Sequence, residues 1–168
     1  VNAAGVLWFD RDKGAVELDP EVWRQVFDIN LTAMLHSLKE AIPRMKAKGG
    51  GSIVNISTIQ CLRGDTAPQD AYQASKAGVI ALTKSIAIQH AADGIRANSL
   101  LPGPTESPMQ ERWQADPDRR RATAAAIPLG RVGRVEDMAN AALFLLSERA
   151  AFITGTELIV DGGVTALP

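Results

Sequence analysis

The chain has 168 residues, a formal net charge of −1 at pH 7 and a hydrophobic fraction of 46%. This length is enough for one domain with a hydrophobic core, and the near-zero charge gives no indication of a nucleic acid or an anionic membrane as a partner. No apolar run approaches the roughly 20 residues that cross a bilayer. Cys61 is the only cysteine, which excludes a disulfide framework and makes a reducing, cytoplasmic location the default expectation. His36 and His90 have no partners at metal-ligand spacing, so we expect no metal site.

The first predicted element is a long helix over residues 20–47. Asp19 precedes it as an N-cap, and Pro20 suits its first turn. An apolar stripe at helical spacing marks its buried face, and Pro43 should bend or thin its last turn. The stripe consists of Trp23, Val26, Phe27, Met34, Leu38, Ala41 and Met45.

Strands and helices then alternate along the chain. The β-branched, apolar run at residues 52–57 predicts a buried parallel strand, and residues 70–92 predict a second long helix that stops at Gly94. The remaining predicted elements are a strand at 95–101, an irregular segment with short helices at 105–127, a helix at 135–149 and a strand at 156–160. This alternation predicts an α/β fold with a doubly wound, mostly parallel, Rossmann-like sheet, in a single domain over residues 1–168.

Small or hydroxyl-bearing residues occupy the ends of three predicted strands. They are residues 2–5, the pair Ser57 and Thr58, and residues 102–107. In open parallel sheets, ligands bind beyond the carboxyl ends of the strands. We therefore expect these three segments to lie along one edge and to line a ligand site.

Tyr72 is the only tyrosine, and Lys76 follows it at a spacing that puts both side chains on one face of a helix. An unperturbed tyrosine has a pKa of about 10. A positive charge about 4 Å away is worth roughly 4 kcal/mol at an effective dielectric constant near 20, which would lower the pKa of the phenol. Such a phenol can exchange a proton with a carbinol oxygen. Simple packing of the ring is the alternative explanation, because this spacing alone is common.

Two neighbouring features bear on the choice between these explanations. Asn30 lies on the apolar stripe of the first helix, and a buried carboxamide must find hydrogen-bond partners. It either ties down a loop in the core or holds a water or backbone group beside Lys76. Ser57 and Thr58 end a strand with their side chains on opposite faces, so only one of them can meet the phenol and donate to a substrate oxygen.

Seven motifs follow one another along the chain: Asn2-Ala3-Ala4-Gly5, Asn30, the Ser57-Thr58 pair, Tyr72-x-x-x-Lys76, Arg96-Ala97-Asn98, Pro102-Gly103 and Val160-Asp161-Gly162-Gly163. In this order they resemble the motifs of the short-chain dehydrogenase/reductase family, and the resemblance covers essentially the whole chain. Pro128-Leu129-Gly130-Arg131 followed by Glu136-Asp137 is also similar to the family pattern before the last helix.

The resemblance implies hydride transfer between NAD or NADP and a secondary alcohol or ketone, with the carbinol proton moving through Tyr72. It implies that Lys76 lowers the pKa of Tyr72 and holds the nicotinamide ribose, and that Asn30 anchors a water of a proton relay. The catalytic hydroxyl of the family is commonly the second of the pair, which favours Thr58 and leaves Ser57 as the alternative. The residues expected to contact the cofactor, besides Tyr72 and Lys76, are Asn2, Ala3, Ala4 and Gly5 on the adenine-ribose side and Pro102, Gly103, Thr105 and Ser107 at the nicotinamide end.

One family feature is absent from the sequence. No segment reproduces the G-x-x-x-G-x-G turn that cradles the pyrophosphate, so the sheet should be truncated at its N-terminal half. We expect either a fragment of a longer enzyme or a naturally shortened relative, with weak dinucleotide binding by this segment. The choice between NAD and NADP stays open, as does the substrate. Met109, Trp113 and residues 122–127 suggest a moderately apolar lid within residues 105–127.

Other readings of the same motifs remain. A non-catalytic binding or interaction module would use the same scaffold, and an extended epimerase or dehydratase shares Tyr-x-x-x-Lys, although the Pro102-Gly103 turn and the Val-Asp-Gly-Gly ending oppose the latter. The resemblance also implies a homodimer or homotetramer, paired through Ala74, Ala81 and Ala87 on the helix at 70–92; packing of that face on its own sheet is the alternative. Residues 119–121, three consecutive arginines, are interpreted as a solvated helix face.

Overall fold

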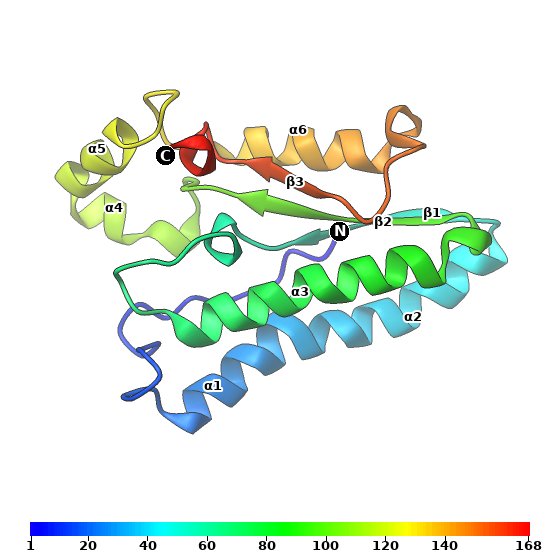
Figure 1. Ribbon diagram of the computed structural model, residues 1–168, viewed down its shortest axis with the longest axis horizontal. Helices are drawn as coiled ribbons and strands as arrows, with labels where there is room; N and C mark the ends of the chain where they lie inside the picture. Colours follow the sequence, from blue (N-terminus) through cyan, green and yellow to red (C-terminus); the bar gives the residue numbers. More distant parts are fainter.

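A parallel sheet flanked by helices organises the chain, and the computed structural model describes all of residues 1–168 (Figure 1). Its strands are β1 (Gly51–Ile56), β2 (Ile95–Pro102) and β3 (Glu157–Val160), in the order β1-β2-β3. Both pairs are parallel, with Ile56 opposite Leu100 and Pro102 opposite Val160. The parallel α/β fold expected from the alternating pattern is therefore confirmed, and the strand ends meet at one edge.

The two faces of the sheet are covered by different helices. On one face, α2 (Ala33–Ala47) and α3 (Asp70–Gln89) pack side by side; on the other lies α6 (Val135–Leu146) (Figure 1). Alternate residues of β1 pack into hydrophobic clusters on the two faces of the sheet. Ile53 packs in a cluster with residues of α2 and α3, whereas Val54 packs with Leu145 of α6. No helix is both long and apolar enough to span a bilayer.

The predicted helix over residues 20–47 is divided into three parts. It runs as α1 (Pro20–Phe27), a π-helical turn (Asp28–Thr32) and α2, and Asp19 caps its start by accepting a hydrogen bond from the Glu21 N–H. The extra residue of the π-turn shifts the buried face, so the expected stripe fails at Trp23. That side chain is 41% exposed, and Val22 and Val26 are the residues that α1 buries.

The second long helix, α3, ends at Gln89 and is followed by a 3₁₀ turn before Gly94, whose φ is +72°. The expectation that Ala87 lies on a free pairing face with Ala74 and Ala81 is wrong. Ala87 is fully buried in the core beneath the sheet. Six helical residues turn a side chain through about 600°, which puts Ala87 on a different face from Ala81.

The C-terminal half follows the predicted order with shorter elements. The segment at 105–127 holds two short helices, α4 (Arg112–Ala115) and α5 (Pro117–Ala125), joined by irregular chain. The predicted helix at 135–149 is α6, continued by a separate 3₁₀ turn (Glu148–Ala150). The lid segment lies beyond the carboxyl ends of the strands, whereas α6 runs along one face of the sheet (Figure 1).

Candidate active site

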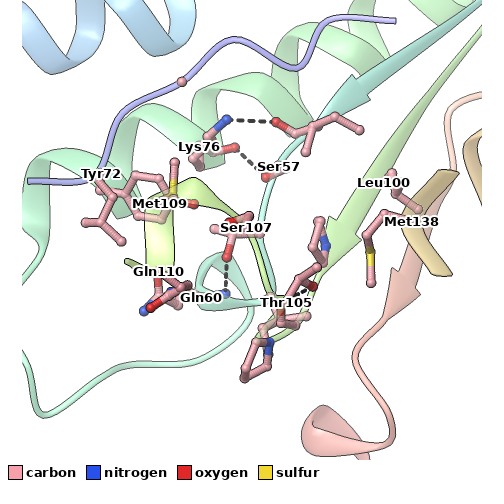
Figure 2. A pocket seen from close by; sticks show the side chains of 18 of the residues that line it. Ser57, Gln60, Tyr72, Lys76, Leu100, Thr105, Ser107, Met109, Gln110 and Met138 are labelled. Carbon is pink, nitrogen blue, oxygen red and sulfur yellow. Dashed lines mark hydrogen bonds between the residues drawn. The ribbon is translucent and has the colours of Figure 1, made fainter. Parts of the chain in front are cut away.

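A cavity of about 760 Å³ lies at the carboxyl ends of the strands (Figure 2). It brings together residues from the three segments that the sequence pattern placed at one edge, together with the start of α3. The predicted site residues that line it are Ala3, Gly5, Ser57, Thr58, Tyr72, Lys76, Pro102, Gly103, Thr105 and Ser107. Asn2 and Ala4 do not line it, because the Asn2 side chain turns aside to hydrogen-bond with Asn55 and Ser37.

Tyr72 is held at the first turn of α3 by a residue far away in the sequence. The carboxylate of Asp12 accepts the backbone N–H groups of Ala71 (3.1 Å) and Tyr72 (2.8 Å). These are among the N–H groups that a helix start leaves without partners, and a carboxylate there also interacts favourably with the helix dipole. Asp12 is only 1% exposed. It therefore fixes the backbone from which the phenol projects.

The phenol of Tyr72 is 7% exposed, and Thr58 is the hydroxyl beside it. Burial raises the pKa of Tyr72 to about 12, and a hydrogen bond with Thr58 acts in the opposite direction. Ser57 is engaged elsewhere, since its hydroxyl donates to the backbone oxygen of Lys76 at 2.8 Å (Figure 2). Of the two hydroxyls, the geometry thus brings Thr58 to the phenol.

The ammonium of Lys76 points toward the end of β1. Its Nζ donates to the backbone oxygen of Ile56 at 2.9 Å, and burial lowers its pKa to about 8 (Figure 2). The expectation that Lys76 lowers the pKa of Tyr72 is not met in this structure, because desolvation of the phenol outweighs every opposing interaction and Lys76 is not among its perturbing groups. A Cβ at Gly5 would lie 3.0 Å from Nζ, so the absence of a side chain there lets the chain pass close to the ammonium.

Asn30 is fully buried in the π-turn, and both the oxygen and the nitrogen of its carboxamide make hydrogen bonds. Its Oδ1 accepts from the Val6 N–H at 2.7 Å, while its Nδ2 donates to the Val6 oxygen at 3.0 Å and to the Ser75 hydroxyl at 3.1 Å. Ser75 in turn donates to the backbone oxygen of Tyr72. Asn30 therefore ties the loop after Gly5 to α3. This is the first of the two roles expected from the sequence, in which the carboxamide ties down a loop in the core. Its place in a water relay beside Lys76 stays a prediction.

Comparison with known proteins shows the family to which the chain belongs. Residues 1–165 match the family model described as Enoyl-(Acyl carrier protein) reductase. The chain is 44% identical over 151 residues to cis-4-hydroxycyclohexanecarboxylate dehydrogenase of Sinomonas cyclohexanicum, an alignment that covers 90% of this chain and 59% of that protein. It is 42% identical to 3beta-hydroxysteroid dehydrogenase 1 of Eggerthella lenta, over 100% of this chain and 63% of the relative.

A solved structure gives the same result. The gluconate 5-dehydrogenase of Burkholderia cenocepacia, in complex with NADP and tartrate, superposes with a TM-score of 0.90 at 30% identity, covering 99% of this chain and 64% of that one. The chain belongs to the short-chain dehydrogenase/reductase family. It spans 59% and 63% of the length of the two curated relatives named above.

Within this short-chain dehydrogenase/reductase cavity, two ends differ in character. One end is apolar: Leu100 and Met138 lie there (Figure 2), and Ile56 and Ala142 belong to the same apolar cluster between the strands and α6. The other end is formed by the loop at 60–69 and the lid, where Met109 and Trp113 contribute as expected. The lid also contributes arginines that the sequence pattern did not single out for the site. Tyr72 and Thr58 line the same cavity as the apolar residues and the arginines.

Asp12 and these arginines are the site residues that sequence reasoning missed. Asp12 sits in an irregular segment, and no local pattern connects it to a helix that begins 58 residues later. Arg119 belongs to the arginine triplet interpreted as a solvated face, yet it lines the cavity. Which members of that triplet form ion pairs is visible only in three dimensions.

Proposed function

We propose that this chain forms the catalytic part of an NAD- or NADP-dependent oxidoreductase that interconverts a secondary alcohol and a ketone, with Tyr72 as the general acid/base. The observation that carries the proposal is the placement of the Tyr72 phenol beside the Thr58 hydroxyl in a cavity that Lys76 also lines. Two relatives named above are dehydrogenases of hydroxylated ring compounds, which supports the same reaction class.

The residues present fit a dinucleotide at its nicotinamide end. Lys76 has three N–H donors and uses one of them on Ile56, which leaves donors for ribose hydroxyls. The close approach at Gly5 and the apolar walls at Ile56 and Leu100 suit a flat ring and its ribose. When bound, the cofactor accepts or supplies the hydride. Solved relatives hold NADP, and the selection between NAD and NADP stays open.

Tyr72 supplies the proton. With a pKa raised to about 12, its phenol is protonated at neutral pH and can donate to the oxygen of a ketone. Thr58 would donate a second hydrogen bond to the same oxygen as negative charge develops there. In the direction of alcohol oxidation, Tyr72 must first lose its proton, so that direction is favoured by high pH.

Replacing Tyr72 by Phe in the complete enzyme tests the proposal. We expect turnover to fall by about 10²- to 10⁴-fold, because the proton donor is removed, while binding of NADH or NADPH, measured by fluorescence titration, stays close to that of the wild type. Full turnover in the variant would contradict the role of Tyr72. If the wild type itself consumes no NADH or NADPH across a panel of ketones, the chain is better described as a non-catalytic binding module.

A further inference from the structure

The lid end of the cavity carries positive charge without matching negative charge. Arg63, Arg112 and Arg119 line the cavity, and none of them takes part in an ion pair. The only acidic residue in the lining is Asp65. Its two carboxylate oxygens accept from neutral donors, the Gln60 side-chain amide and the Ala67 N–H, each at 3.0 Å. The lining therefore contains three arginines and one carboxylate that is already engaged.

The neighbours of Arg119 show that free arginines are not the rule in this segment. On the same helix, α5, Arg120 pairs with Glu106 and Arg121 pairs with Asp118. Neither of these two side chains lines the cavity. The arginine that faces the cavity is thus the one without an acidic partner, although Asp116 and Asp118 lie close to it in the sequence.

Arg112 is held in place without being neutralised. Its guanidinium lies over the ring of Phe9, 3.5 Å from the centroid, and its Nε donates to Gln110 Oε1 at 3.0 Å. Stacking and a neutral acceptor fix the orientation of the planar group and leave its other N–H donors available. Burial and then the nearby charge of Arg119 lower its pKa, with Asp65 acting in the opposite direction. The positive charges of Arg112 and Arg119 therefore disfavour each other, and a bound anion would offset this repulsion.

A second unsatisfied group lies in the lining. Gln69 is only 5% exposed, and its Oε1 has no hydrogen-bond partner. A buried acceptor without a donor is uncommon in folded proteins. A hydroxyl or amide of a bound molecule would satisfy it. This end of the cavity thus offers cationic donors and a polar acceptor, a combination that suits a polar, negatively charged molecule better than a hydrocarbon.

We propose that Arg63, Arg112 and Arg119 bind the carboxylate of the substrate, so that the enzyme acts on a secondary alcohol, or its ketone, that bears a carboxylate at the end remote from the reacting carbon. This proposal rests on the proposed function, because it places the reacting carbon at Tyr72. Planar guanidinium groups match the two oxygens of a carboxylate, and such charge-assisted hydrogen bonds are among the strong ones.

Two substrates that share one secondary alcohol test the proposal. The complete enzyme is assayed with 4-hydroxycyclohexanecarboxylate and with the corresponding carboxamide, each with NAD and with NADP. We expect kcat/KM for the acid to exceed that for the amide by about tenfold or more, since a hydrogen bond to a charged group contributes about 1.5 to 3 kcal/mol. Equal kcat/KM values for the two compounds would overturn the proposal while leaving the proposed function intact.

A pair of adjacent substitutions provides the matched control. Arg119→Gln should raise KM for the acid about tenfold and raise it for the amide much less, because it removes one cation from the cavity and the amide carries no charge. Arg121→Gln, in the same helix but outside the lining, should leave both substrates unaffected. An equal effect of Arg119→Gln on acid and amide would refute a role in binding the carboxylate.

A binding measurement separates this proposal from the proposed function. Cyclohexanecarboxylate and cyclohexanecarboxamide are titrated at constant ionic strength, and the indole N–H signal of Trp113, a buried lining residue, is followed by NMR. The acid should shift this signal in the wild type and in Arg121→Gln, and about tenfold more weakly in Arg119→Gln. If neither 4-hydroxy compound is oxidised, the shift of the Trp113 signal by the acid still supports the anion site. A wild-type signal that does not respond to the acid overturns the anion site.

Discussion

The wall of the cavity formed by α3 and the wall formed by the lid differ in how far their polar groups are satisfied. On the α3 wall, Ser57 and Lys76 are buried, and each makes a hydrogen bond to the backbone. Asn30 does not line the cavity; it supports this wall from behind, where it bonds to the Val6 backbone and to Ser75 of α3. On the other wall, Arg63 of the loop at 60–69 and Arg119 of the lid are exposed and have no ion-pair partner. The first wall is organised before a ligand arrives, and the second has binding capacity that only a ligand can use.

This difference predicts which measurement each wall controls. A group that is fixed in place contributes to catalysis because little reorganisation is needed during the reaction. A group that gains its partner only from the ligand contributes to binding and hence to KM. Substitutions on the α3 wall should therefore affect protein stability and kcat, in contrast to the lid substitutions proposed above.

The largest effect on stability is expected for Asn30→Ala. The substitution leaves the N–H and oxygen of Val6 and the Ser75 hydroxyl without their partner in a fully buried site. We expect the free energy of unfolding to fall by about 3 to 4 kcal/mol, measured by urea denaturation. Thr32→Ala, at an exposed position of the same π-turn, should change it by less than about 0.5 kcal/mol. Similar losses in both variants would show that Asn30 has no special role.

Lys76 gives the α3 wall a characteristic pH dependence. Its pKa is about 8 in the folded protein and 10.5 for a lysine free of such burial, so between these values the unfolded chain binds more protons and stability rises with pH. Relative to Lys76→Met, the wild type should gain up to about 3 kcal/mol between about pH 7 and pH 10.5. The measurement is the difference in unfolding free energy between the two proteins across this range. A difference that does not change with pH would contradict the lowered pKa.

The two hydroxyls at the end of β1 should separate into a catalytic and a structural residue. Thr58→Val removes the hydroxyl beside the phenol while keeping the shape of the side chain. We expect kcat to fall by about 10²-fold and the pKa of Tyr72 in the pH–rate profile to rise, because a hydrogen bond that lowers it is lost.

Ser57→Ala is the matched comparison for this effect. Its hydroxyl bonds to the backbone of Lys76, so this substitution should lower the unfolding free energy by about 1 kcal/mol and have the smaller effect on kcat. If Ser57→Ala abolishes turnover and Thr58→Val does not, Ser57 is the catalytic hydroxyl.

Sequence patterns predicted the residues of the α3 wall much better than the residues that hold this wall in place. The parallel sheet, the spacing of Tyr72 and Lys76, and the strand ends at Ser57 and Pro102 all follow from local periodicity and from the rule that strand ends meet at one edge. The lowered pKa of Lys76 did not follow from the sequence, because the competition between burial and neighbouring charge depends on three-dimensional distances. The π-turn that holds Asn30 likewise has no periodic signal of its own.

The support that the sequence concealed most completely is Asp12, and its predicted effect on stability is smaller than that of Asn30. Asp12→Ala removes the acceptor for two N–H groups at the start of α3, so we expect a loss of about 2 kcal/mol in unfolding free energy; Asp12→Asn, which retains one oxygen, should lose about 1 kcal/mol. Asp10→Ala, at an exposed position of the same segment, serves as the control. If Asp12 only stabilises the fold, kcat of the folded variants stays at the wild-type value. If it also positions Tyr72, kcat falls in Asp12→Ala and is partly restored in Asp12→Asn, because a helix start that is not held lets the phenol move away from Thr58.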